Sequence, residues 1–290
     1  MKYYLLLTLF IMCTSTIKSD QSNSPYTLGE EIAAIKNSKL EEISGIAPST
    51  LYEDCLWVHN DSADEPNVYL INLSGELIAT LSFPVKNRDW EAITISDGYL
   101  YIGEIGDNRA IYPDKIIYRV AEPTTIDISK RDQKIFTDEY ESMKFNFSNG
   151  QRDCESMMFD PISSELVLIS KREANVMVYT TPFQPTHGDE VILIDSCAEL
   201  NFTLATAGDI SPAGDKILIK NYTNIYFWER IGSQSIVEAL SVEPTTLAYD
   251  PEPQGEAIAW STHEDLFYTI SEKVGSSSPI IYKYKRITIE

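Results

Sequence analysis

Basic side chains and histidines are scarce in this sequence. Among its 290 residues, 23 are Lys or Arg, 44 are Asp or Glu and only three are His, which gives a formal net charge of −21. Such an acidic excess repels the phosphates of nucleic acids and of anionic lipids. Three histidines also provide little material for a histidine-rich metal cage or a catalytic triad. We therefore expect no nucleic-acid partner.

Several well-known catalytic and metal-binding motifs are missing as well. The sequence contains no Gly-x-Ser-x-Gly, no His-Glu-x-x-His, no phosphate-binding loop and no Cys-x-x-Cys. The signatures of common nucleophilic, zinc-dependent and nucleotide-binding sites are therefore absent. Helical periodicity is not sustained anywhere in the chain, which argues against a helical fold.

Long apolar runs are missing too, and this bears on the N-terminus. Residues 5–12 form an apolar run of eight that follows Met1-Lys2 and precedes the polar stretch 14–20. A membrane-spanning helix needs about 20 apolar residues, whereas a short apolar core after a charged start is typical of a secretory signal. We predict a signal peptide at 1–19, a single domain at 20–290 and no membrane span. The protein is then secreted, or periplasmic in a bacterium.

Cysteine is also rare, and three residues remain after the signal peptide: Cys55, Cys154 and Cys197. An oxidising compartment favours at most one disulfide and leaves one thiol over, although three free cysteines fit the sequence equally well. Acceptor motifs for N-glycosylation in a eukaryote are more numerous. They are centred on Asn60, Asn72, Asn146, Asn201 and Asn221.

A short acidic motif recurs along the chain. Its clearest form is Asp89-Trp90-Glu91-Ala92-Ile93, and weaker copies place Ser44, Glu155, Asp209 and Glu256 at the position of Glu91. Successive copies are 47, 64, 54 and 47 residues apart, and each is followed by a turn and an apolar strand that ends in polar residues. These intervals have the length of a four-stranded blade. They predict an all-β, five-bladed β-propeller, with six blades of about 45 residues as the alternative.

The two ends of the chain are expected to share one blade. A strand-like run at 31–35 precedes the first copy, and only 34 residues follow Glu256, enough for three strands. An N-terminal strand that completes the last blade would remove the free sheet edges, as propellers commonly do. A loose N-terminal arm is the alternative. Elsewhere, the polar stretch 124–132 predicts an excursion within blade 2, and residues 191–194 are predicted as the last strand of blade 3.

The innermost strand of each blade lines the axis of a propeller, so the recurring acidic position should form a ring there. Carboxylates that face one another repel, and they relax by binding a cation or by raising their pKa values. Oxygen ligands outside the cell favour Ca²⁺. We therefore predict a Ca²⁺ site, with capping of backbone amides or pairing with Arg88 and Arg152 as the alternative. The predicted ligands are Ser44, Glu91, Glu155, Asp209 and Glu256.

Charged residues that follow equivalent strands should gather at one mouth of the channel. Five of them are the candidates for chemistry: Asp61, Asp107, Arg109, Lys171 and Arg172. A carboxylate such as Asp61 or Asp107 can accept a proton from water. The basic side chains can stabilise charge that develops on oxygen.

The sequence resembles known propeller families at several of these motifs. Ser44-Gly45-Ile46-Ala47, Asp89-Trp90-Glu91-Ala92-Ile93 and Gly255-Glu256-Ala257-Ile258 resemble a family of secreted, mostly uncharacterised phytase-like or esterase-like propellers. More distantly, Leu100-Tyr101-Ile102-Gly103 and Ser170-Lys171-Arg172 are similar to the calcium-activated nucleotidases (apyrases). That likeness implies five blades and an axial calcium ion, although Ser44 replaces an acidic residue of the ring.

Two classes of function follow from these expectations. The first is a metal-dependent hydrolase of phosphate or carboxylic esters or phosphoanhydrides, acting on a small anionic or ester ligand. The alternative is a non-catalytic secreted protein that binds a ligand or contributes an acidic surface to the extracellular matrix. In either case we expect a monomer.

Overall fold

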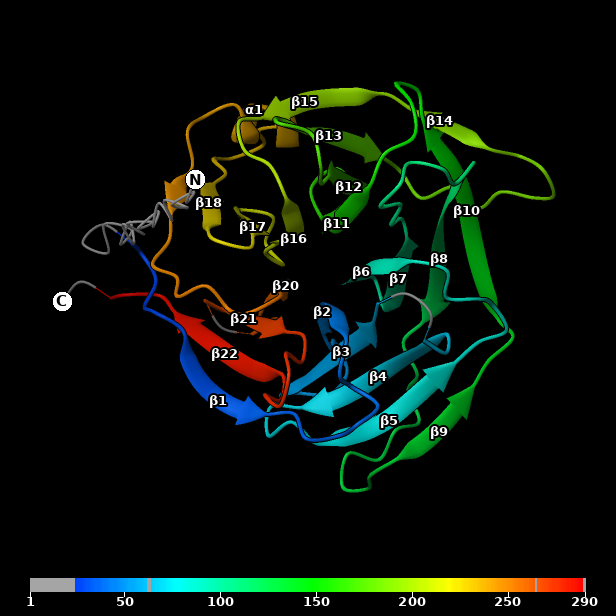
Figure 1. Cartoon of the computed structure of the whole chain (residues 1–290), viewed down its shortest axis with the longest axis vertical. Helices are drawn as coiled ribbons and strands as arrows, with labels where there is room; N and C mark the ends of the chain where they lie inside the picture. Colours follow the sequence, from blue (N-terminus) through cyan, green and yellow to red (C-terminus); the bar gives the residue numbers. More distant parts are fainter. Residues whose placement is uncertain (1–23, 62–63, 264, 289–290) are drawn as a thin grey trace, which may run out of the picture.

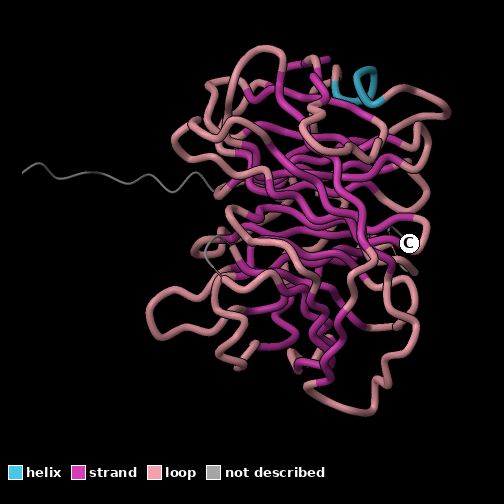
Figure 2. Tube along the Cα trace, turned by 90° about the vertical axis from the view of Figure 1, so that its right-hand side faces the viewer, coloured by secondary structure: helices cyan, strands magenta, loops and turns pink. Residues whose placement is uncertain are grey.

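Five β-sheets arranged around a central axis form the molecule (Figure 1). The computed structural model describes residues 24–61, 64–263 and 265–288, so the predicted signal peptide at 1–19 lies outside the described residues. The protein is an all-β, five-bladed β-propeller, as predicted, and the six-bladed alternative is wrong. Strands run between two loop-covered faces, and one short helix, α1 (Ile236–Leu240), lies at the periphery (Figure 2). No helix of the described chain is long and apolar enough to cross a membrane.

Blades 1 and 2 contain five strands each, and blades 3 and 4 contain four. From the innermost strand outward, blade 1 consists of β2 (Ile43–Pro48), β3 (Cys55–Asn60), β4 (Asn67–Asn72), β5 (Leu77–Ser82) and β9 (Gln133–Phe136), and blade 2 of β6 (Trp90–Ser96), β7 (Tyr99–Glu104), β8 (Lys115–Ala121), β10 (Tyr140–Phe147) and β14 (Ile192–Ile194). Blade 3 consists of β11 (Cys154–Asp160), β12 (Glu165–Ser170), β13 (Val176–Thr181) and β15 (Ser196–Leu200), and blade 4 of β16 (Ala205–Ile210), β17 (Lys216–Asn221), β18 (Ile225–Glu229) and β19 (Thr245–Thr246).

Blade 5 closes the ring with strands from both ends of the chain. It consists of β20 (Gly255–Trp260), β21 (Leu266–Ser271), β22 (Ile280–Lys285) and β1 (Glu30–Ala34). Strand β1 pairs antiparallel with β22, from Glu30 opposite Lys283 to Ala34 opposite Ile280. The prediction that an N-terminal strand completes the last blade is confirmed, and a loose N-terminal arm is excluded.

Blades 1 and 2 each receive their fifth strand from the segment of chain that forms the next blade in sequence. The excursion of blade 2 supplies β9, which pairs parallel with β5 of blade 1, and β14 pairs parallel with β10 of blade 2. The prediction that 191–194 is the last strand of blade 3 is therefore wrong, because β15 occupies that place. Sequence favoured the wrong strand because Ile192-Leu193-Ile194 is strongly apolar, whereas Ser196-Cys197-Ala198-Glu199-Leu200 contains no β-branched or aromatic residue.

Each innermost strand has a β-bulge near its start. The register against the second strand shifts once in every blade, so that one residue of the innermost strand has no directly opposed partner. A bulge bends the strand and redirects the side chain of the extra residue. The five bulge residues are Ser44, Glu91, Glu155, Thr206 and Glu256.

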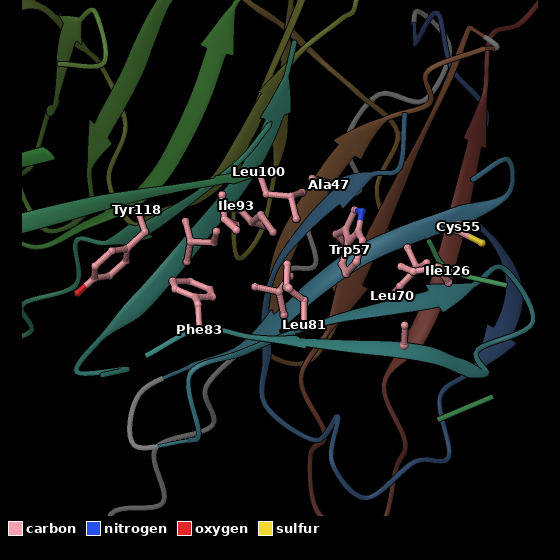
Figure 3. Packing of buried hydrophobic residues seen from close by; sticks show 14 of the residues in the cluster. Ala47, Cys55, Trp57, Leu70, Leu81, Phe83, Ile93, Leu100, Tyr118 and Ile126 are labelled. Carbon is pink, nitrogen blue, oxygen red and sulfur yellow. The ribbon is translucent and has the colours of Figure 1, made fainter. Parts of the chain in front are cut away.

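The hydrophobic core is divided into five clusters, one between each pair of neighbouring blades. Between blades 1 and 2, Trp57 and Leu81 pack against Ile93 and Leu100 (Figure 3). Phe83 stacks on Trp90 with ring centroids 5.7 Å apart. Burial of aromatic rings between the blades stabilises the fold against repulsion among its acidic residues, because each buried large side chain contributes about 1.5–3 kcal/mol.

Two of the three cysteines and two of the predicted glycosylation asparagines lie in the interior. Cys55 and Cys154 are buried and Cys197 is exposed, and all three are free thiols. Asn60 and Asn221 are buried, and their side-chain amides donate to the carbonyls of Lys39 and Thr203. Neither Asn side chain is therefore accessible to a glycan in the folded protein.

Closure of the ring predicts a clear effect of substitution just after β1. Ile35 is 1% exposed, belongs to the cluster between blades 5 and 1, and donates its N–H to Pro279 O at 2.8 Å. Ile35→Ala should lower the free energy of unfolding by about 2–4 kcal/mol, measured in urea. The matched control Ile128→Ala, at a position 51% exposed, should change it by no more than about 0.5 kcal/mol. Equal effects of the two substitutions would show that the N-terminal segment is not docked.

Candidate functional site

The bulge residues of the five innermost strands converge on one end of the axis. The Ser44 hydroxyl donates to Glu91 Oε2 at 3.3 Å. The Glu256 carboxylate lies close enough to Glu155 to contribute to the raised pKa of Glu155, after burial and Asp153. Four members of the predicted ring, Ser44, Glu91, Glu155 and Glu256, are therefore brought together.

Asp209 does not join this ring. The bulge of β16 falls at Thr206, whose hydroxyl bonds to Gly255 O at 3.4 Å, and Asp209 lies three residues further along the strand. Its carboxylate accepts N–H groups from Ile210 at 2.9 Å and Trp260 at 2.8 Å. Burial raises the pKa of Asp209 to about 7. On sequence alone, Asp209 aligns with Glu91 because both are acidic. This alignment is wrong, because the bulge residue of blade 4 is Thr206, which is not acidic.

A second group of side chains lies one position beyond the end of each second strand. Its members are Asp61, Ile105, Lys171, Tyr222 and Glu272. Two further acids, Asp89 and Asp153, precede the innermost strands of blades 2 and 3. We define the mouth as the acidic and basic side chains and the tyrosine of these groups, together with Arg172, which follows Lys171: Asp61, Asp89, Glu91, Asp153, Glu155, Lys171, Arg172, Tyr222, Glu256 and Glu272.

Two overlapping sets of carboxylates in the mouth have the spacing of metal ligands. Asp61, Asp89 and Glu91 offer one oxygen each, all within 4.8 Å of one another, and Glu91, Asp153 and Glu155 do the same. The pKa of Glu91 is raised well above its usual range, by burial and then by the neighbouring carboxylates. Burial, with Asp61 and Asp153 adding to it, raises the pKa of Asp89 to about 6. A cation at either set would remove this repulsion.

The loop after β7 leaves room for these carboxylates. A Cβ on Gly106 would lie 2.4 Å from Glu91 Oε1 and 2.6 Å from Asp89 Oδ2, so no larger residue fits there without displacing them. The Gly106 N–H also donates to Asp89 O at 3.2 Å. Gly106 thus lets the loop after β7 pass directly against the candidate ligands.

Blades 3 and 4 contribute a neutralised side of the mouth. The Lys171 ammonium forms an ion pair with Glu155 and donates to Tyr222 Oη at 3.0 Å, and the Tyr222 hydroxyl donates to Glu256 Oε1 at 2.6 Å. Burial disfavours the charged form of Lys171, but the Glu155 carboxylate outweighs it and raises the pKa of the lysine. Lys171 is therefore a buried cation with a fixed partner.

Blade 5 contributes a pair of glutamates. Glu272 is half-buried beside Glu256, and its pKa is raised to about 8 by burial, followed by the charge and hydrogen bond of Glu256. Asp61 adds to this repulsion across the boundary between blades 5 and 1. The acidic charge of the mouth is thus concentrated on blades 5, 1 and 2.

The remaining predicted catalytic residues differ in their accessibility. Asp107 is buried and accepts the N–H groups of Ile111 at 2.8 Å and Tyr112 at 3.0 Å and the Lys115 ammonium at 3.0 Å. Burial opposes ionisation of Asp107, but these bonds prevail and lower its pKa. This bonding suits a residue that orders the loop.

Arg172 and Arg109 are both exposed, but they lie in different places. Arg172 donates to Asp153 Oδ2 at 2.5 Å and also contacts Asn108. Arg109 lines a surface pocket of about 330 Å³ that also includes Asp89 and Tyr112. Arg172 is the predicted arginine for which an ion pair with a carboxylate of the mouth is observed.

The axis itself is almost filled below the mouth. The cavity lined by Ser44, Glu91, Glu155 and Gly208 measures about 10 Å³. Such a cavity holds about one water molecule or ion. Access to the candidate ligands is therefore from the mouth and not through a continuous tunnel.

Reasoning from the sequence missed Asp89 and Asp153 as members of the two carboxylate sets, and it missed the hydrogen bonds that Tyr222 makes with Lys171 and Glu256. One usable signal was present, because Asp-Trp-Glu and Asp-Cys-Glu repeat the same Asp-x-Glu spacing in blades 2 and 3. Residues two apart in a strand point to the same side. Tyr222 has no such signal, since its hydroxyl connects residues from three blades.

Comparisons with known proteins add little to this description. No family model and no curated protein matches the sequence. Among solved structures, the chain is similar to one titled "Crystal structure of Nidogen/Laminin Complex", with a TM-score of 0.46 and 12% sequence identity over 79% of this chain and 72% of that chain. The fold assignment depends on the five sheets themselves. The resemblance to phytase-like, esterase-like and nucleotidase propellers stays a prediction beyond the fold.

Removal of the buried lysine tests the neutralised side of the mouth. Lys171→Met should lower the free energy of unfolding at pH 7 by about 3–5 kcal/mol, because it leaves the Glu155 carboxylate buried without its cation. The double substitution Lys171→Met with Glu155→Gln should recover most of this loss. Urea unfolding of wild type, of Lys171→Met, of Glu155→Gln and of the double variant gives the coupling energy between the two side chains. A single substitution that costs less than about 1 kcal/mol would contradict the buried pair.

The raised pKa of Glu272 predicts a pH dependence of stability. An unfolded glutamate titrates near 4.3, so the folded protein binds this proton more tightly and loses stability as the pH rises from about 5 to 8. In chelator, Glu272→Gln should flatten this decline, measured as the free energy of unfolding at pH 5, 6.5 and 8. The control Glu139→Gln, at an exposed position, should leave the slope unchanged. An unaltered slope in Glu272→Gln would count against the shift.

Proposed function

We propose that the mouth binds a divalent cation, with Ca²⁺ as the best fit, at Asp61, Asp89 and Glu91. The observation that carries this proposal is the spacing of their oxygens, within 4.8 Å of one another. Ca²⁺ takes oxygen ligands at 2.3–2.6 Å, so oxygens bound to one ion are at most about 4.6–5.2 Å apart, and this spacing allows all three carboxylates to reach the same ion. Ca²⁺ is the best fit because it accepts carboxylate ligands in flexible geometry, whereas Mg²⁺ demands a near-ideal octahedron and usually keeps several waters.

Charge favours this set over the neighbouring one. Both basic side chains of the mouth, Lys171 and Arg172, pair with Glu155 and Asp153. Asp153 also accepts the N–H of Asp107 at 2.8 Å. The acidic charge on Glu155 and Asp153 is thus already compensated, whereas the cluster on blades 1 and 2 gains more from a cation.

The bound cation would in turn make the mouth attractive to an anionic or ester ligand. Seven carboxylates and only two basic groups define the mouth, so an anion is repelled until a cation is present. Arg172 is exposed and lies beside the carboxylates, where its guanidinium can pair with a phosphate or carboxylate group. We infer that ligand binding depends on Ca²⁺ and takes place outside the cell, following the predicted signal peptide.

Hydrolysis of a phosphate or carboxylic ester is the reaction that this arrangement favours. A divalent cation supplies charge that polarises a phosphoryl or carbonyl oxygen. Asp61 is half-buried at the mouth, and its carboxylate oxygen that does not bind the cation can accept a proton from water. Asp107 is less suited to this role, because it bonds the N–H groups of Ile111 and Tyr112 and the Lys115 ammonium. Arg172 would stabilise charge on the ligand. A non-catalytic binding or matrix protein would need the cation but not these two roles.

Thermal unfolding tests the cation. Ca²⁺ at about 100 times its dissociation constant should stabilise the protein by about 2.7 kcal/mol and raise the melting temperature relative to chelator. Glu91→Gln should abolish the increase. Asp209→Asn is the matched control, because Asp209 lies outside the mouth, and it should retain the increase. If Asp209→Asn loses the shift and Glu91→Gln keeps it, the cation is bound elsewhere.

Catalysis needs a separate measurement. Wild type and Arg172→Ala should be assayed with nucleoside diphosphates, phytate and aryl esters at millimolar Ca²⁺ and in chelator. A Ca²⁺-dependent turnover that falls about tenfold or more in Arg172→Ala would support the hydrolase. Absence of turnover, with the thermal shift retained, would leave the Ca²⁺-dependent binding protein as the function.

A further inference from the structure

A second pocket lies at the opposite end of the axis from the mouth. It measures about 250 Å³ and is lined by residues near the carboxyl ends of all five innermost strands. Representative residues are Ala47, Ile95, Phe159, Asp209 and Trp260, one from each blade. The mouth lies at the amino ends of the same strands. Three residues of strand separate Asp209 from Thr206, or about 10 Å, so the two sites are distinct.

The walls of this pocket, which we call the distal pocket, are partly apolar. Ile95, Phe159 and Pro212 provide apolar surface, and Thr94 and Ser211 provide hydroxyl groups. Among the residues that the structure describes, no Lys, Arg or His lines the pocket. The mouth, in contrast, contains both Lys171 and Arg172.

Asp209 is the half-buried carboxylate of the distal pocket, and it is held in a fixed orientation. Its Oδ1 accepts the N–H of Ile210 and its Oδ2 accepts the N–H of Trp260, which connects the innermost strands of blades 4 and 5. Within the described part of the chain, these two amides are the groups that favour its ionised form, and no basic side chain contributes. Each oxygen keeps a second lone pair for another donor. Asp97, at the exposed turn after β6, adds a second carboxylate to the rim.

We propose that the distal pocket binds a small organic cation, a protonated amine with an apolar body. The ammonium group would pair with Asp209, since a half-buried carboxylate without a counter-charge gains most from a cationic ligand. The apolar body would contact Ile95 and Phe159, in a volume suited to a molecule with one ring. An anion is disfavoured there, because the protein is acidic and none of the described residues that line the pocket is basic. The proposal does not depend on the function of the mouth.

Three isosteric probes test the proposed ligand class: 2-phenylethylamine, 2-phenylethanol and phenylacetate. The amine should bind wild type saturably in ligand-observed NMR titrations, and the alcohol and the acid about ten- to a hundredfold more weakly. Asp209→Asn should weaken the amine by the same factor and leave the alcohol unchanged. Equal binding of amine and alcohol, or an unchanged amine affinity in Asp209→Asn, would overturn the proposal.

Two further variants separate the distal pocket from the rest of an acidic surface. Ser96→Tyr introduces a large side chain into the pocket wall while Asp209 is kept, and it should abolish binding of the amine. Glu91→Gln changes the mouth alone and should bind the amine like wild type. Retained binding in Ser96→Tyr, or loss in Glu91→Gln with native melting behaviour, would place the amine elsewhere and refute the assignment.

Discussion

The β-bulge at the start of every innermost strand is the constraint on which the mouth depends. Without the extra residue, the regular alternation of a strand would place Glu91 and Glu155 on another face of the sheet. The bulge brings five side chains together at the axis, and the blade-to-blade packing of large aromatic residues holds the strands there. The backbone therefore determines where these side chains lie, and the residue that each blade supplies at the bulge determines the chemistry of the mouth.

The five blades supply different residues, so the mouth has lost the symmetry of its fold. Blades 3 and 4 carry Lys171 and Tyr222 at the position where blades 1 and 5 carry Asp61 and Glu272. One side is internally compensated and the other accumulates negative charge. A symmetric ring of acids would offer a cation several equivalent positions, whereas this division would direct the proposed cation to one side, near Arg172.

Much of the fold could be predicted from the sequence, because the blade period and the apolar strands are local signals. The closing strand was predictable for a related reason: the last repeat was one strand short. The placement of β9 in blade 1 and of β14 in blade 2 was not predictable, because the sequence of a strand does not reveal which sheet edge it joins. In the site, Glu91, Glu155 and Glu256 were identified by their repeated motif. The misplacement of Asp209 arose because register depends on a bulge that the sequence of blade 4, with Thr206, does not reveal.

The exchanged strands have a consequence for biosynthesis. Blade 1 is complete only when Phe136 has been synthesised, and blade 2 only when Ile194 has followed. Strand β1, among the first described segments to leave the ribosome, has no partner until Lys285 is made. During vectorial synthesis, each of these sheets therefore exposes an open edge for the time needed to add tens of residues. Propellers with self-contained blades avoid this delay, whereas this chain gains outer strands that bind each early blade to a later segment.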